Sequence, residues 1–353
     1  KSSGELKTKP TQASVKDLQG MGIQPDILVC RSDYPLDDGI KRKIAQFCNV
    51  EKERVIQNLD AEVLYEVPLM MENEHLAHEA CACLHLPCPE PDLSEWRKMI
   101  DNWKHPKHKI EVALVGKYVS LHDAYISVVE SLEHAGVANS ADVTIRWVDS
   151  ERVSSYNDEM LGGVQGIIVP GGFGDRGIEG MICSIQYARE HKIPYLGLCL
   201  GMQLTIVEFA RNVLGYADAH SKEFNENTEH PMIHIMADQD GVTNIGGTLR
   251  LGSYPCVLAD GSKAEELYGT KEISERHRHR YEVNNKYRDV LQENGMMLSG
   301  CSPDGRIVEM IEIPSHPFFL ATQAHPEFKS RPNKAHPLFR GFIEASLKNG
   351  GMI

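Results

Sequence analysis

The sequence has little of what would place the protein in a membrane or on a nucleic acid. Its 353 residues contain no apolar run of about 18 residues, the length that a membrane-spanning helix needs, and no signal-peptide pattern at the start. Basic residues are in the minority, with 37 Lys and Arg against 50 Asp and Glu, a net charge of −13 at pH 7. Such an acidic chain is poorly suited to bind polyanions. We therefore expect a cytoplasmic protein that binds neither nucleic acid nor membrane.

The cysteines do not form a disulfide framework, because their number is nine and their spacing is irregular. An odd, scattered set favours a reducing compartment. Three of them, Cys81, Cys83 and Cys88, are close enough to suggest zinc. A structural zinc site needs four ligands, however, and here the fourth is unclear and the flanking sequence reads as helix. We therefore expect no metal in this chain.

The sequence also lacks the ATP-binding pattern Gly-x-x-x-x-Gly-Lys-Ser/Thr, so no P-loop is present. What it has instead is a short apolar strand, predicted over 166–169, that ends in Pro170 and then Gly171 and Gly172. Backbone N–H groups exposed there can stabilise the oxyanion of an attacked carbonyl group. The alternatives are a plain glycine-rich loop and a phosphate cradle.

The segment 195–203 reads YLGLCLGMQ, an apolar strand that runs into a cysteine and then a helix. Gly197 and Gly201 lie two residues either side of Cys199, where the absence of a Cβ allows a tight strand-to-helix turn. A thiol at a helix N-terminus is favoured as the thiolate. An inert buried cysteine is the alternative.

A third feature, His325-Pro-Glu327, directly follows an apolar strand at 317–323. The imidazole of His325 can take the proton of a thiol, and the carboxylate of Glu327 can orient that imidazole. Together with Cys199, these residues predict a nucleophile, a base and an orienting acid.

The chain divides into two parts by pattern. From residue 110 onward, apolar strands alternate with helical segments, which predicts an α/β fold with a doubly wound, mostly parallel sheet and an antiparallel extension within 246–313. A smaller, incomplete α/β segment precedes it, in which Ile40, Ile44 and Phe47 share one face of a predicted helix and two short helices within 60–86 are expected to break near Pro68. We predict domains at 1–88 and 110–353, with a proline-rich linker over 89–109.

These features resemble the class I glutamine amidotransferases, which use a Cys-His-Glu triad. The resemblance rests on PGGFGDRGIEGM at 170–181, YLGLCLGMQ at 195–203, GGTLRLG at 246–252 and HPEF at 325–328. It implies that catalysis is by Cys199, His325 and Glu327, with the backbone N–H groups of Gly172 and Leu200 as the oxyanion hole. It further implies a glutamine site made by Gly171, Phe173, Gln203, Glu223 and Arg280.

Two further phrases, ERHRHRYEVN at 275–284 and GELKTKPTQ at 4–12, resemble those amidotransferases that use ATP and glutamine to convert UTP into CTP. The resemblance implies a homotetramer, activation by GTP with Arg176 as the coupling residue, and no covalently bound cofactor. Because the chain begins at Lys1 without Met, we expect a C-terminal portion whose ATP and Mg²⁺ site belongs to a preceding synthetase domain. The implied UTP or CTP contacts are Lys7, Thr8, Lys9, Gln12 and Lys43. From the residues alone, Lys7 and Lys9 read as a solvated terminus.

Two other functions remain open at this point. One is a γ-glutamyl hydrolase or peptidase on the same fold, and the other is a non-catalytic assembly module. Glu223 and Arg280 should distinguish glutamine hydrolysis from the first of these functions. Both should matter if free glutamine is the substrate, because they would bind its amino acid end. The complete set of Cys199, His325 and Glu327 argues against the second.

Overall fold

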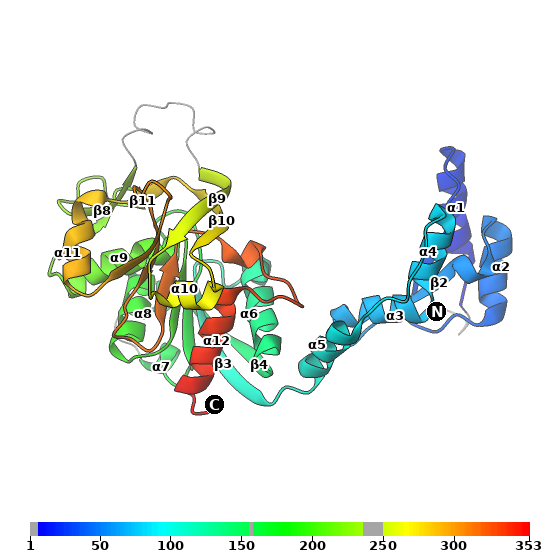
Figure 1. Cartoon of the computed structure of the whole chain (residues 1–353), viewed down its shortest axis with the longest axis horizontal. Helices are drawn as coiled ribbons and strands as arrows, with labels where there is room; N and C mark the ends of the chain where they lie inside the picture. Colours follow the sequence, from blue (N-terminus) through cyan, green and yellow to red (C-terminus); the bar gives the residue numbers. More distant parts are fainter. Residues whose placement is uncertain (1–5, 155–157, 236–249) are drawn as a thin grey trace. The chain divides into compact units, whose positions relative to one another are not determined.

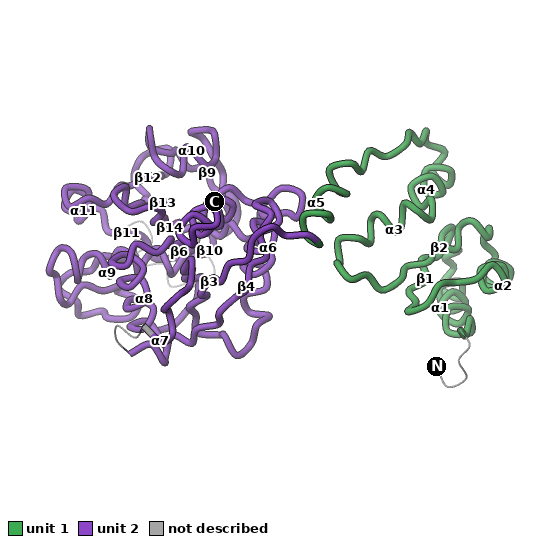
Figure 2. Tube along the Cα trace, turned by 90° about the horizontal axis from the view of Figure 1, so that it is seen from below, with its two compact units in different colours: residues 1–104 green, residues 105–353 purple. Residues whose placement is uncertain are grey.

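The computed structural model describes residues 6–154, 158–235 and 250–353. The chain separates into two compact units, Lys1–Lys104 and His105–Ile353, and each is described by itself (Figures 1 and 2). Two of the motifs above lie partly outside the described residues. These parts are Gly4 and Glu5 of GELKTKPTQ and residues 246–249 of GGTLRLG.

The first unit is built on two parallel strands, β1 (Leu28–Ser32) and β2 (Val55–Leu59), which α2 (Asp38–Cys48) connects. Asp37 caps α2 by accepting a hydrogen bond of 2.8 Å from the N–H of Ile40, and Asn49 ends it in the left-handed conformation. A small core includes Val15, Ile44, Cys48 and Val55. The other elements of this unit are α1 (Lys9–Gly20), η1 (Lys52–Arg54), η2 (Leu64–Glu66), α3 (Val67–Asn73), α4 (Leu76–Leu84) and α5 (Ser94–Lys104).

Two local expectations for this unit are wrong. The helical spacing predicts that Phe47 shares one apolar face of α2 with Ile40 and Ile44, but Ile44 is buried while Phe47 is 62% exposed. Pro68 does not break a helix, because it lies in the first turn of α3, where no N–H is needed. The break comes instead at Glu74 and His75.

The second unit contains a sheet with nine strands in the described part of the chain. Five adjacent strands that reach one edge of the sheet are parallel and the other four form an antiparallel extension, so the predicted doubly wound, mostly parallel fold is confirmed. In spatial order the strands are β10 (Glu272–His279), β9 (Arg250–Leu258), β12 (Met297–Cys301), β13 (Val308–Glu312), β14 (Phe319–Thr322), β6 (Tyr195–Leu198), β5 (Gly166–Val169), β3 (His108–Gly116) and β4 (Ala141–Asp149).

Helices cover both faces of this sheet (Figure 1). One apolar core lies between the sheet and the helices α8 (Ile178–Glu190) and α9 (Leu200–Asn212). A second core lies on the other face, against α6 (Ile126–Ala138) and α12 (Pro337–Asn349). Strands β5 and β6 are buried at every residue, as expected for strands covered on both faces.

The remaining elements are short. A three-stranded sheet comprises β11 (Tyr281–Val283), β8 (Pro231–Ile235) and β7 (His220–Ser221). The other helices are η3 (His122–Tyr125), η4 (Ser150–Arg152), α7 (Asp158–Leu161), α10 (Lys263–Tyr268), η5 (Asn285–Tyr287), α11 (Arg288–Glu293) and η6 (Pro326–Phe328). None of the helices in the described residues has the length and apolar character needed to cross a membrane.

Candidate active site

Cys199 occupies a strained turn between β6 and α9. Its backbone has φ +50° and ψ −100°, a conformation that non-glycine residues rarely adopt, and its N–H donates a 2.7 Å hydrogen bond to the carbonyl of Thr322 on β14. The turn is tight because Gly201 packs against β5: a Cβ on Gly201 would lie 2.2 Å from the carbonyl oxygen of Val169. The neighbouring strands therefore impose the strain that presents the thiol at the carboxyl end of the sheet.

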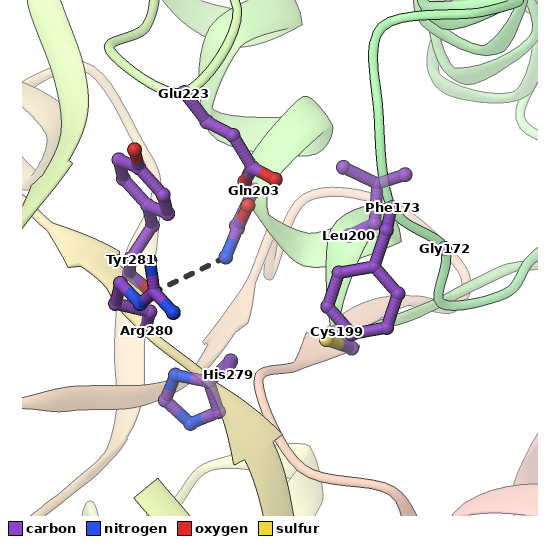
Figure 3. A pocket seen from close by; sticks show the side chains of 9 residues that line it. All are labelled: Gly172, Phe173, Cys199, Leu200, Gln203, Glu223, His279, Arg280 and Tyr281. Carbon is purple, nitrogen blue, oxygen red and sulfur yellow. Dashed lines mark hydrogen bonds between the residues drawn. The ribbon is translucent and has the colours of Figure 1, made fainter. Parts of the chain in front are cut away.

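Gly172 and Leu200, the two predicted oxyanion donors, line one cavity together with Cys199 (Figure 3). Gly172 follows β5, and Leu200 opens α9. A Cβ on Gly172 would lie 3.6 Å from the side chain of Leu200, so the two segments are adjacent. The backbone of these two segments therefore lies beside the thiol, next to the space that the carbonyl group of a substrate would occupy.

His325 and Glu327 lie beyond the end of β14, the strand next to β6. The Nδ1 of His325 is 2.7 Å from Oε1 of Glu327, and the backbone N–H of His325 donates to the carbonyl of Arg276 at 2.7 Å. Burial alone would lower the pKa of His325, but hydrogen bonding to Cys199 and to Glu327 raises that pKa well above its ordinary value. The arrangement favours the charged imidazolium form of His325.

The cavity beside Cys199 holds four of the five predicted glutamine contacts, Phe173, Gln203, Glu223 and Arg280 (Figure 3). The cavity has a volume of about 160 Å³ and opens to solvent, and His279 and Tyr281 complete its walls. Burial raises the pKa of Glu223, although Lys117 and Arg280 oppose this. One acid and one guanidinium in the same cavity suit the ammonium and the carboxylate of an amino acid.

Gly171, the fifth predicted glutamine contact, lines a second hollow together with His325, Glu327 and Phe328. Its position is close to the triad, and a Cβ on Gly171 would lie 3.0 Å from Cε1 of His325. Cys199 and Phe173 line both hollows. The nucleophile therefore stands at the boundary between them.

Lys117, which the sequence reasoning did not single out, is 3% exposed and supports the loop after β5. Its Nζ donates to the carbonyl of Phe173 at 3.1 Å and also to the carbonyl of Gly174. Burial lowers the pKa of Lys117 to about 8, and the nearby carboxylates of Glu223 and Asp175 oppose this. The one available sequence signal is its place directly after strand β3, at the ligand-binding edge of the sheet.

Arg176, the predicted GTP-coupling residue, is held by contacts within the protein. It donates to the carbonyl of Lys117 at 2.8 Å, pairs with Glu151 at 3.0 Å, and stacks over the ring of Tyr118. Tyr118 lines the second hollow, so Arg176 lies next to that hollow's wall.

The predicted nucleotide contacts lie in the first unit. Thr8 is buried and accepts a 3.0 Å hydrogen bond from Gln12 at the start of α1. Lys7, Lys9 and Lys43 are exposed, the last of them on α2. The described residues include no group of three or more His, Cys, Asp or Glu side chains placed to hold a metal ion.

Comparison with known proteins supplies independent evidence. Residues 120–345 match the family model "Glutamine amidotransferase class-I", and residues 1–86 match "CTP synthase N-terminus". The chain is 57% identical over 346 residues to the CTP synthase of Caldanaerobacter subterraneus subsp. tengcongensis, covering 98% of this chain and 64% of that protein. It is 56% identical over 352 residues to the CTP synthase of Carboxydothermus hydrogenoformans, covering 99% of this chain and 66% of that protein.

A solved structure is similar as well. The glutaminase domain of Trypanosoma brucei CTPS, with bound acivicin, matches with a TM-score of 0.64 and 39% identity, over 68% of this chain and 94% of that one. The chain spans less than two thirds of the length of the curated relatives given above.

Proposed function

Because this chain belongs to the CTP synthase family of class I glutamine amidotransferases, we propose that it releases ammonia from glutamine for the conversion of UTP into CTP. The observation that carries the proposal is the position of Cys199. It lies between a His325–Glu327 pair and a cavity that contains both Glu223 and Arg280.

In the proposed reaction, the Cys199 thiolate attacks the side-chain amide carbon of glutamine. The resulting oxyanion accepts hydrogen bonds from the backbone N–H groups of Gly172 and Leu200. The C–N bond then breaks, the nitrogen takes a proton from His325, and ammonia leaves a glutamyl thioester. His325 next takes a proton from water, which attacks the thioester and expels the thiolate as glutamate forms. Glu327 keeps the imidazole in the required orientation.

We further propose that the ammonia aminates UTP, after ATP has phosphorylated the pyrimidine 4-oxygen. Lys7, Thr8, Lys9, Gln12 and Lys43 are the proposed UTP or CTP contacts, since lysines suit phosphates as point charges. The ATP and Mg²⁺ site is proposed to lie in the part of the relatives' length that this chain does not span. Activation by GTP near Arg176 and assembly as a homotetramer belong to the same proposal.

A γ-glutamyl hydrolase is the second candidate, because Cys199 and His325 would serve that reaction equally well. The family match, rather than the charges in the cavity, favours free glutamine, because Glu223 and Arg280 suit the ammonium and carboxylate that glutamine shares with the first residue of a γ-glutamyl peptide. An assay of ammonia release from glutamine, compared with cleavage of a γ-glutamyl peptide, separates the two. Preference for the peptide would overturn the assignment.

Replacing Glu223 with Gln, or Arg280 with Met, is expected to raise the KM for glutamine about 10- to 100-fold. Each change removes a charge-assisted hydrogen bond, typically worth about 1.5–3 kcal/mol. Steady-state ammonia release measures the effect. Glu226→Gln, an exposed change in the same loop, is the matched control and should leave KM within about twofold. Unchanged KM in both cavity variants would contradict the proposed substrate.

The buried ammonium of Lys117 predicts a pH dependence. Because burial lowers its pKa to about 8, the charge that holds the Phe173 carbonyl and faces Glu223 is present below that pH and is lost above it. We expect the KM for glutamine to rise as the pH passes upward through about 8. In Lys117→Met the KM should be high throughout, without this rise. Lys348→Met, at an exposed position, should retain the wild-type profile, and an identical profile in Lys117→Met would refute the role of Lys117.

A further inference from the structure

A chain of two buried amides connects the wall of the cavity to the nucleophile. Gln323, directly after β14, is fully buried, and its Nε2 lies 3.6 Å from Sγ of Cys199. Gln203, on α9, is 3% exposed, and its Nε2 lies 3.2 Å from Oε1 of Gln323 and 3.2 Å from the carbonyl oxygen of Tyr281. The order of contacts is therefore Tyr281 carbonyl, Gln203, Gln323 and thiol.

The backbone around these amides is fixed. The N–H of Gln323 donates to the carbonyl of Glu309 at 2.8 Å, and the residue before it, Thr322, accepts the N–H of Cys199 at 2.7 Å. Gln323 and Cys199 are therefore held by hydrogen bonds between adjacent strands. Their side chains meet without any loop movement.

The orientation of both amides follows from the carbonyl of Tyr281, which can only accept hydrogen bonds. Gln203 must point its NH₂ group at this carbonyl, and the second hydrogen of the same group meets Gln323. Gln323 must then present its oxygen to Gln203 and its NH₂ group to the sulfur. Turning either amide round would place two acceptors or two donors face to face in a buried site, which is costly.

This polarity has a chemical consequence at the sulfur. A thiolate only accepts hydrogen bonds, so a fixed N–H donor stabilises it without adding a charge. Because the NH₂ group of Gln203 is used in these contacts, its side-chain oxygen can accept a hydrogen bond from the ammonium of an amino acid bound in the cavity. An ammonium bound there would strengthen the donors along the chain, because hydrogen bonds in series polarise one another.

We propose that Gln323 is a positioning residue for the reaction, and that Gln203 and Gln323 form an amide relay. The relay donates a hydrogen bond to the Cys199 thiolate and couples it to the amino end of the substrate. The second half of this statement rests on the proposed function. The first half depends only on the contacts among Tyr281, Gln203, Gln323 and Cys199.

The test follows the rate at which chloroacetamide, a small neutral reagent, alkylates Cys199 as the pH is varied. Peptide mass spectrometry isolates this thiol from the other eight cysteines. Gln323→Met, which removes the donor, is expected to move the midpoint of the profile upward by about one pH unit and to slow alkylation about tenfold below it. Gln323→Glu has the same shape and presents oxygen to the sulfur, so its midpoint should rise at least as far.

Two other variants test the role of the second amide and control for the effect of mutation. Gln203→Met removes no contact with the sulfur but frees Gln323 to turn, so it should shift the midpoint in the same direction by a smaller amount. Gln292→Met, at an exposed position on α11, should match the wild type. Thermal unfolding identifies which of the Gln323 variants remain folded, and the profile is measured on those.

A profile that superimposes on the wild type in a folded Gln323 variant would show that Gln323 only fills space, and the relay would be wrong. Chloroacetamide has no amino acid group, so this outcome is independent of the substrate. A shifted profile in a protein that does not hydrolyse glutamine would support the donor to Cys199 and reject the proposed function. A shifted profile with glutamine hydrolysis would support both.

Discussion

Replacing Cys199 with Ala is expected to lower glutamine hydrolysis by at least about 10⁴-fold, because no other group can form the thioester. Cys199→Ser should lose nearly as much, since the His325–Glu327 pair faces a hydroxyl that is far harder to deprotonate than a thiol. Ammonia release from glutamine at saturating substrate measures both. The backbone donors at Gly172 and Leu200 remain in these variants, so the loss reports on the nucleophile alone.

Cys183→Ala is the matched control, because Cys183 is a half-buried thiol on α8 in the same unit. It should keep activity within about twofold of the wild type. Retention of more than a few per cent of the activity in a folded Cys199→Ala protein would mean that the proposed mechanism is wrong.

Gly201→Ala is expected to have the largest effect on folding. The added Cβ would lie 2.2 Å from the carbonyl oxygen of Val169 and 3.1 Å from its carbon, both backbone atoms of a central strand that cannot move aside. Overpacking of this kind costs about 3 kcal/mol or more, and any relief moves the turn that carries Cys199. We expect a lower unfolding midpoint, together with loss of glutamine hydrolysis.

The effect of Gly201→Ala is checked by thermal unfolding against Gly20→Ala. Gly20 lies at the end of α1, where a Cβ would meet nothing within 4 Å, so this control should unfold as the wild type does. A Gly201→Ala protein with wild-type stability and activity would show that the turn relaxes easily. The strain at Cys199 would then not come from the contact with β5.

The order of local motifs was enough to predict where the site would form. Apolar runs before Gly171, Cys199 and His325 predict strands, and parallel strands bring their carboxyl ends to one edge of a sheet. The sequence does not reveal that β14 is the neighbour of β6, because more than a hundred residues separate His325 from Cys199. That pairing depends on sheet order, which local pattern does not encode.

Lys117 and Gln323 show what the pattern leaves out. Each is a polar residue directly after the last residue of a strand, and by pattern alone each looks like an ordinary strand end. Their importance comes from burial and from contacts with Phe173 and Cys199, residues distant in the sequence. Gly171, a predicted glutamine contact, lines the hollow beside His325 and not the cavity beside Glu223, a difference that local pattern does not encode.

Whether the cavity beside Cys199 binds glutamine is decided by labelling the intact protein with a glutamine-mimicking diazoketone in the presence of GTP, followed by mass measurement and peptide mapping. We expect a single adduct on Cys199, its absence in Cys199→Ala, and slower labelling in Glu223→Gln. A folded protein that gains no adduct, or gains one at another cysteine, would contradict the assignment of this cavity as a glutamine site.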